Sequence, residues 1–262
     1  MNIKRSSWKI VPVILFLGVF IRFLILSPQG FQEKLWWLGS AVCHQLPGHS
    51  FHLNGLQFPL CARCTGSFLS AFIAMLFFLV RGKKPAMPPK GIIACFTIFF
   101  FFWVVDGINS FSSEILHQQL LYPPTNILRF LSGIGMGMVF ALIIMTIFNM
   151  VIWKDQQETA LLQDWKQLGV LLLCESTLVL FPFLRNTFLF QLAGFFSIAT
   201  VVILIAVLYT ILFVVFTHKE ATYVRFKELI FPLLVGFSAA LLQMLLIGNM
   251  HKSFFPFSNF PL

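Results

Sequence analysis

Long apolar runs, separated by short polar segments, make up most of this chain of 262 residues. A helix needs about 20 apolar residues to cross ~30 Å of hydrocarbon, and most of the runs reach that length. The pattern predicts an all-α fold, a polytopic integral membrane bundle of about seven transmembrane helices. We place these helices at residues 10–26, 61–80, 91–108, 126–153, 168–184, 187–216 and 229–248.

The first apolar run resembles a signal peptide, because Lys4, Arg5 and Lys9 precede it. No small-x-small cleavage site follows, so we interpret the run as an uncleaved transmembrane helix. Arg22, near its far end, is expected to extend its charge to the headgroups. The next segment, residues 31–59, is expected to be re-entrant or interfacial, with two tryptophans at the membrane surface.

We expect three parts along the chain. Residues 1–39 hold the first transmembrane helix and the start of an outer loop. Residues 40–153 hold a motif of cysteines and histidines together with the second to fourth helices, and residues 154–262 hold the remaining helices.

The composition excludes a soluble domain, because only 10% of the residues are charged, where a soluble domain has about a quarter. The formal net charge of +9 does not indicate nucleic acid, since the basic residues lie between apolar runs and not on one polar face. No nucleic-acid partner is predicted. The expected partner is the lipid bilayer.

Lysine and arginine are distributed unevenly among the polar segments. With the N-terminus inside the cell, the inner segments hold twelve of them and the outer segments four. Basic segments of membrane proteins stay in the cytosol. We therefore predict a multi-pass protein of the cytoplasmic (inner) membrane with a cytoplasmic N-terminus, so that the segment before the second helix faces the extracytoplasmic side.

That segment ends in a short polar stretch between two apolar runs, residues 43–66. The stretch contains three of the chain's five cysteines and three of its six histidines. It begins at Cys43 with Cys-His-Gln-x-Pro-x-x-Ser-Phe, continues through Gly55, and ends with Pro-x-Cys-Ala-Arg-Cys-x-Gly, which starts at Pro59. Side chains that lipid would exclude are thus gathered in one place.

This pattern resembles the signature of a bacterial membrane-protein family of unknown function, DUF family 2085. The resemblance continues through Asp106-Gly107 and Thr125-Asn126-x-x-Arg129, and it covers about residues 40–150. His49 departs from it, since the family more usually has arginine before the serine. The resemblance implies a membrane fold and a set of candidate residues, but no activity.

The alternation of the helices brings further polar residues to the level of the motif. Asp106 lies ~22 Å along the third helix, in the outer leaflet. Asn126 and Arg129 lie on one face of the fourth helix, within its first ~6 Å. These three are the candidate catalytic residues. The candidate metal ligands at the same level are Cys43, His44, Cys61 and Cys64.

Three interpretations of the cysteines stay open. Three thiolates and one imidazole form a tetrahedral ligand set typical of zinc, with His49 or His52 as alternatives to His44. A Cys-x-x-Cys pair at a helix start beside Arg63 also suits a thiol-disulfide oxidoreductase. The third interpretation is a structural disulfide in a transporter or assembly factor. Zinc binding is our main hypothesis.

Asp106 and Arg129 are candidates for function because charged groups at membrane depth are costly. In one interpretation they form a mutual ion pair that joins two helices. In the other, Arg129 and Asn126 clamp an anionic group, such as a lipid-linked phosphate substrate, and Asp106 is a general base or a metal ligand. The sequence leaves open whether the protein is an enzyme.

Three further expectations concern residues outside the motif. Gly133 and Gly137 are spaced by four on the fourth helix, which predicts close contact with a neighbouring helix. Glu175, in the middle of the fifth helix, needs a polar partner such as a glutamine, or a proton. Glu114 is expected in a solvated loop.

Overall fold

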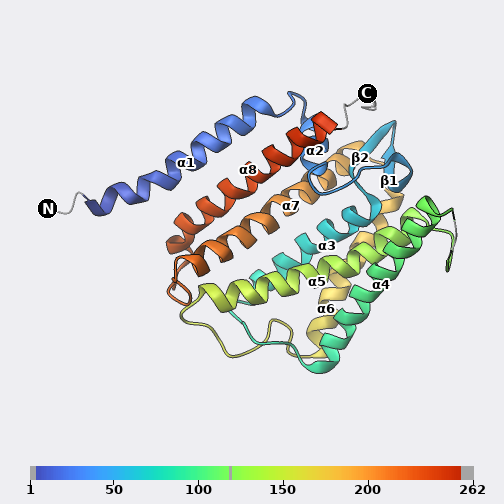
Figure 1. The fold of residues 1–262 in the computed structure, drawn as a ribbon. Coiled ribbons are helices and arrows are strands. Elements are labelled where there is room, and N and C mark those ends of the chain that lie inside the picture. The colour runs from blue at the N-terminus through green and yellow to red at the C-terminus, as the bar shows by residue number, and fades with distance from the viewer. Residues whose placement is uncertain (1–3, 118–119, 255–262) are drawn as a thin grey trace.

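The structure, a computed structural model, describes residues 4–117 and 120–254 of the chain. Its long helices lie side by side as a bundle, with a small β-hairpin at one end (Figure 1). In chain order the elements are α1 (Lys4–Leu26), α2 (Phe31–Gly39), η1 (Pro47–His49), β1 (Ser50–Leu53), β2 (Leu56–Cys61), α3 (Ala62–Leu79), α4 (Lys90–Ile115), α5 (Asn126–Ile152), α6 (Trp165–Ser176), η2 (Thr177–Phe183), α7 (Thr187–Phe216), η3 (Phe226–Leu229) and α8 (Ile230–Phe254).

Six helical segments in the described part of the chain are long and apolar enough to cross a membrane. They are α3, α4, α5, α6 with η2, α7, and η3 with α8. The helices α1 and α2 together would add a seventh, although the chain bends by 110° between them. The predicted all-α membrane bundle is therefore confirmed.

The segment expected to be re-entrant or interfacial, residues 31–59, contains the short helix α2, a 3-10 turn and most of a β-hairpin. Asn54 and Gly55 join the two antiparallel strands, and their φ angles are 51° and 79°. Positive φ at both central residues is typical of a type I′ turn, for which Asn-Gly is a favoured pair. Because β2 ends at Cys61 and α3 begins at the next residue, the hairpin continues directly into a membrane helix.

Helices α3 and α5 approach each other closely through glycines. A Cβ atom on Gly133 would lie 2.2 Å from the carbonyl oxygen of Arg63, and one on Gly137 would lie 2.2 Å from that of Ser67. Gly66 on α3 meets the backbone of α5 in the same way. The close helix contact expected from the spacing on α5 is present, and it fixes the first turn of α3 against α5.

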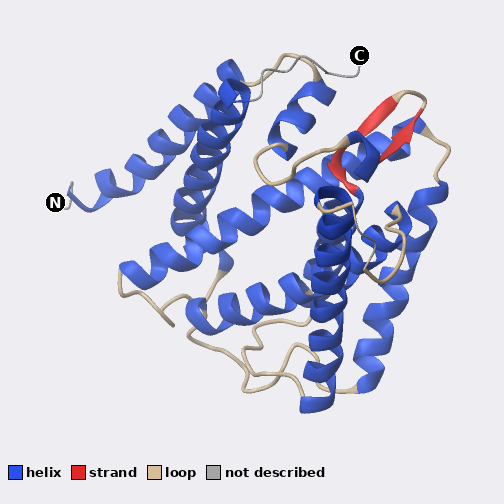
Figure 2. Cartoon of the chain, turned by 45° about the vertical axis from the view of Figure 1, so that its right-hand side comes forward, coloured by secondary structure: helices blue, strands red, loops and turns tan. Residues whose placement is uncertain are grey.

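The polar connections gather at two ends of the bundle, as Figure 2 shows. We call one the hairpin end, which comprises α2, the hairpin, the end of α4 and the start of α5. The other is the basic end, which comprises the connections at residues 80–89, 153–164 and 217–225. Lys83 links all three connections. Its Nζ lies 2.7 Å from Oδ1 of Asp155 and 4.3 Å from the ring centre of Trp153, and it donates to the carbonyl oxygen of Val224.

Candidate metal centre and the polar site beside it

Three cysteines from separate elements meet at the hairpin end. Cys43 follows α2, Cys61 ends β2, and Cys64 lies in the first turn of α3. Their sulfur atoms all lie within 4.8 Å of one another. The chain's five cysteines are all free thiols in the structure. Three of the four predicted metal ligands are therefore brought together.

The local charge of this cluster favours a thiolate on Cys61. Hydrogen bonds from the Cys43 and Cys64 thiols lower the pKa of the Cys61 thiol, against the opposing effect of burial. The pKa of Cys43 is raised, chiefly because its thiol donates to Cys61. Cys61 also occupies the N-cap position of α3, where the helix dipole favours negative charge. A metal cation that replaced the thiol protons of Cys43 and Cys64 would be attracted by the same negative charge on the Cys61 sulfur.

Gln45 holds Cys43 against the hairpin. Its side chain is buried, and its Nε2 donates to the carbonyl oxygens of Trp36, at 2.6 Å, and of Pro59, at 2.8 Å. In return, Gln57 of β2 donates to the carbonyl oxygen of Gln45 at 2.7 Å. The glutamine of the motif therefore joins α2 to β2, and this contact brings the two halves of the cysteine cluster together.

His44 is not part of the cysteine cluster in the described structure. Its ring is exposed, and its Nε2 lies 3.2 Å from Nδ1 of His49. It still lies close enough to Cys61 for its charge to act on that thiol. His44, the fourth predicted ligand, thus lies near the cluster but is not one of the residues whose ligand atoms lie within 4.8 Å of one another.

Asp106 is fully buried and has donors at both carboxylate oxygens. Nε of Arg63 donates to Oδ2 at 3.0 Å, Ser132 donates to the same oxygen at 3.2 Å, and Tyr122 donates to Oδ1 at 3.1 Å. Arg63 also donates to the hydroxyl of Ser110 at 2.9 Å. The ion pair of Asp106 is with Arg63 on α3, and not with the arginine of α5 that the sequence suggested.

Arg129 is buried, and its hydrogen-bond partners among the described residues are an amide and an imidazole. Its side chain donates to Oδ1 of Asn126 at 3.0 Å and contacts Nε2 of His49 at 2.9 Å. Its Nε is buried without a partner, and among the described residues no carboxylate lies within ion-pair distance of it. Asn126 in turn donates to the carbonyl oxygens of Gly48 and Ser50. The amide therefore holds the guanidinium at the hairpin, and the nearest acids act on its charge without forming an ion pair with it in the described structure.

A histidine and a glutamate complete this site, and sequence reasoning did not assign them together. Nε2 of His49 lies 2.8 Å from Oε1 of Glu114, which is in the last turn of α4 and not in a loop. Burial, followed by the charge of Arg129, lowers the pKa of the His49 imidazole, and Glu114 opposes that shift. The four-residue spacing of Asp106, Ser110 and Glu114 would have placed all three on one helical face, had α4 been predicted to its full length.

Glu175 lies elsewhere, inside the bundle. It is 3% exposed, and neither carboxylate oxygen has a hydrogen-bond partner among the described residues. The nearby Ser70 donates to the carbonyl oxygen of Ile134, and Gln243 accepts from Tyr209. The glutamine partner expected for this acid is therefore not found among the described residues.

Comparison with known proteins identifies relatives without an assigned activity. An uncharacterized protein of Methanothermobacter thermautotrophicus is 27% identical over 112 residues, which are 42% of this chain and 91% of that protein. An uncharacterized protein of Methanocaldococcus jannaschii is 29% identical over 119 residues, or 44% of this chain and 69% of that protein. No solved structure matches. Both organisms are archaea, so the bacterial origin implied by the resemblance stays a prediction.

The cysteine cluster and the polar site lie within a segment that matches a family of membrane proteins. Asp106, Asn126 and Arg129 fall in the same segment as the three clustered cysteines. Residues 43–143 match the model of the family described as "Predicted membrane protein (DUF2085)", and over this segment the chain is similar to that family.

Proposed function

We propose that this membrane protein binds zinc through Cys43, Cys61 and Cys64, and that Arg129 holds an anionic, lipid-linked substrate beside the metal. The observation that carries the proposal is the meeting of three free thiols from separate elements within 4.8 Å. The second part is supported by Arg129 at the same end of the bundle, which has an unpaired Nε and no carboxylate within ion-pair distance among the described residues.

The donor set fits zinc. Two sulfurs bound to one tetrahedral zinc are about 3.8 Å apart, given Zn–S distances of ~2.3 Å. The sulfurs here need to move little to reach that spacing. Thiolates prefer soft or borderline metals, of which zinc has no redox chemistry. Three protein ligands leave one tetrahedral position for His44, water or substrate.

Zinc bound there would polarise a substrate oxygen or activate water. The residues around it have distinct parts in this proposal. Arg129 binds the anionic group, because a guanidinium forks onto phosphate or carboxylate oxygens. Asn126 positions Arg129 through the 3.0 Å hydrogen bond to its guanidinium. His49 and Glu114 form the pair best placed to carry a proton.

Asp106 acts as a positioning residue in the proposed site. Its carboxylate oxygens are occupied by donors, which makes it poorly suited to be a general base or a metal ligand. It fixes Arg63, which lies between Cys61 and Cys64 in the chain. Its part is therefore to hold the first turn of α3 in place.

The distribution of charge supports an extracytoplasmic position for this site. The connections at the basic end, with the two residues that follow each of them, carry nine of the 18 lysines and arginines of the chain, and such segments stay in the cytosol. The hairpin end then faces outward in the cytoplasmic membrane, with the N-terminus inside. An anionic lipid-linked substrate would reach the site from the outer leaflet.

Metal analysis of the detergent-purified protein tests the metal site. We expect zinc in the wild type and its loss in Cys43→Ser, Cys61→Ser and Cys64→Ser, because each change removes one of three thiolate ligands. Cys95→Ser and Cys174→Ser are matched controls that lie outside the cluster and should keep the metal. Equal metal content in the wild type and in the triple serine variant would overturn the proposal.

Thiol exchange is the second candidate, and the Cys61 thiolate flanked by two further thiols favours it. Trapping of free thiols in intact cells separates the two candidates. A zinc site keeps the three cysteines reduced, whereas an oxidoreductase shows a disulfide among them whose fraction changes when reductant is limited.

A further inference from the structure

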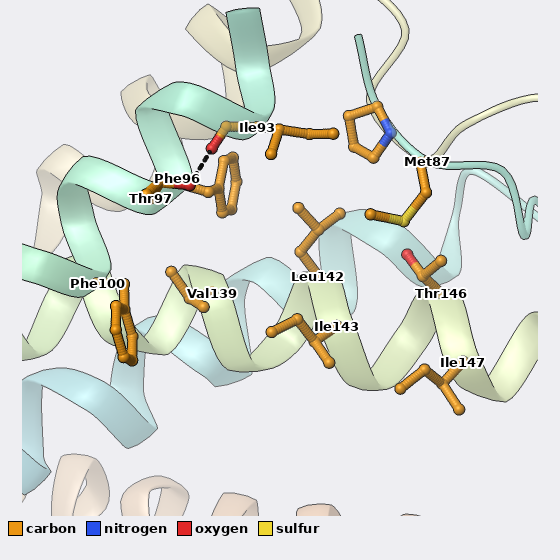
Figure 3. A pocket seen from close by; sticks show the side chains of 11 residues that line it. Met87, Ile93, Phe96, Thr97, Phe100, Val139, Leu142, Ile143, Thr146 and Ile147 are labelled. Atoms are coloured by element: carbon orange, nitrogen blue, oxygen red, sulfur yellow. Dashed lines mark hydrogen bonds between the residues drawn. The ribbon is translucent and has the colours of Figure 1, made fainter. Parts of the chain in front are cut away.

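Figure 3 shows a pocket between α4 and α5. Its lining residues come from the connection 80–89, the first half of α4 and the second half of α5, so it lies near the basic end and away from the cysteine site. Its volume is ≈ 420 Å³, which falls within the ~300–1,000 Å³ of small-molecule sites. Apolar side chains of both helices form its walls, and Met87 and Pro88 close it toward the basic end. Such a pocket accepts a hydrocarbon chain.

One polar group in the pocket has no partner in the described part of the chain. Thr146, which lines the pocket beside Met87 (Figure 3), is 7% exposed, and its buried Oγ1 makes no hydrogen bond with any described residue. Thr97, across the pocket, instead donates to the carbonyl oxygen of Ile93 at 3.0 Å. An unpaired buried hydroxyl is unfavourable. An acceptor oxygen on a ligand would satisfy it.

Two lysines stand at the same end of the pocket. Lys90 is exposed and lies three residues before the lining residue Ile93, so it is on that face of α4, ~4.5 Å along the axis. The carbonyl oxygen of Lys84 accepts from Asn149, one turn beyond Thr146 on α5. Within residues 4–117 and 120–254, neither lysine is in an ion pair. Positive charge therefore lies where the apolar pocket meets the membrane surface.

We infer that this pocket binds a phospholipid with an anionic headgroup. One acyl chain fills the space between α4 and α5, an ester oxygen accepts a hydrogen bond from Thr146, and the headgroup lies between Lys84 and Lys90. The vertical order of charge, hydroxyl and apolar wall matches the order of headgroup, ester and chain in such a lipid. This site is independent of the function proposed for the cysteine cluster.

Competition between two lipids tests the inference. Delipidated protein is mixed in detergent with phosphatidylglycerol and phosphatidylcholine of the same acyl chains, repurified, and its retained lipid is measured by mass spectrometry. We expect the wild type to retain phosphatidylglycerol in preference. The double variant K84Q/K90Q should lower that preference by about tenfold or more, since lysines near a membrane surface attract anionic lipid.

Two further variants test the pocket itself. Ile143→Trp fills the pocket from a position that is 52% exposed, so it should abolish retention of both lipids and leave the helix contacts intact. Thr146→Val should weaken retention of both. The matched controls are K154Q/K166Q, which removes the same charge from the same end, and Leu208→Trp, which adds an indole to an exposed position of α7.

The inference would be overturned if the wild type retained the two lipids equally. It would also be overturned if Ile143→Trp retained as much lipid as the wild type. K84Q/K90Q changes one half-buried and one exposed side chain, and it keeps the inference falsifiable if the tryptophan variant does not fold. An unchanged lipid preference in that variant, or an equal loss in K154Q/K166Q, would contradict the site.

Discussion

Two arginines of the hairpin end, the half-buried Arg63 and the buried Arg129, differ in what balances their charge. Arg63 is paired with the carboxylate of Asp106, and both groups have further hydrogen bonds. Arg129 has an amide and an imidazole as partners, and its Nε has none within the described ranges. A buried ion pair is stable only when both members are satisfied. Arg63 therefore stabilises the fold through its ion pair, whereas Arg129 can still bind an anion.

Loss of this ion pair should be costly. Asp106→Asn leaves Arg63 partly buried beside a neutral group, and we expect a loss of roughly 3–5 kcal/mol in the free energy of unfolding. Asp155→Asn removes a partner of Lys83 in an exposed pair, for which we expect at most about 1 kcal/mol. Unfolding in detergent with increasing denaturant measures both. Similar losses in the two variants would show that the ion pair of Asp106 does not stabilise the fold in this way.

Loss of the unpaired arginine should act on ligand binding instead. We expect Arg129→Gln to remove most of the preference for a polyprenyl phosphate over the matching polyprenol, by about tenfold or more, because a charge-assisted hydrogen bond is lost. The measurement is lipid retention after repurification. Arg22→Gln, at an exposed arginine of α1, is the control and should keep the preference. A preference that survives in Arg129→Gln would refute the clamp.

The spacing of residues in the sequence was enough to predict the cysteine cluster, but not the pairing of the charged residues beside it. The cysteines could be grouped because two are three residues apart and the third begins the same polar stretch. The pairing of Asp106 with Arg63 could not be predicted, since it depends on the rotation of α4 about its axis. His49 and Glu114 are 65 positions apart in the chain, and their contact depends on how the hairpin folds.

At the scale of elements, the contact between α3 and α5 determines where the first turn of α3 lies. Gly133→Ala would place a methyl group against the carbonyl oxygen of Arg63, so the helices must separate. We expect a loss of about 1–3 kcal/mol in stability, together with weaker zinc retention. Gly169→Ala on α6 is the matched control, because a Cβ there meets no atom within 4 Å.

Thermal unfolding and metal analysis of both glycine variants check this expectation. A Gly133→Ala protein as stable as Gly169→Ala, with full metal content, would mean that the helices adjust without disturbing the cluster.

The helices were more predictable than their ends. We ended the third helix at residue 108, where the apolar run stops, but α4 continues to Ile115. Its last turns carry polar residues that face the protein: Asn109, for example, bonds the backbone at Leu121 and Tyr122. The apolar pattern of the sequence cannot predict such a turn, because its buried residues are polar. The hairpin was missed as well, although Asn54-Gly55 is a strong turn signal, because residues 31–59 were interpreted as one interfacial segment.

At the scale of the whole molecule, length and hydropathy were enough to predict the membrane bundle, since each span must satisfy its own backbone in lipid. The bent connection between α1 and α2 was not predictable in this way. Neither the packing of α1 against α8 nor the burial of Trp37 beside Phe23 follows from a count of apolar residues.

The side of the membrane that each end faces can be measured directly. Epitope tags inserted after Gly48 and after Gly82 mark the hairpin end and the basic end. Because basic connections stay in the cytosol, we expect antibody to reach the first tag on intact spheroplasts and the second only after permeabilisation. The reverse pattern would place the cysteine cluster in the cytosol.

The unbroken passage from β2 into α3 has a mechanical consequence. No residue lies between the end of β2 and the start of α3, and Arg63 and Cys64 lie in the first turn of α3. A molecule that displaced the hairpin would therefore also shift these two side chains. Binding at the membrane surface would then be coupled directly to a change in the packing of α3 inside the bundle.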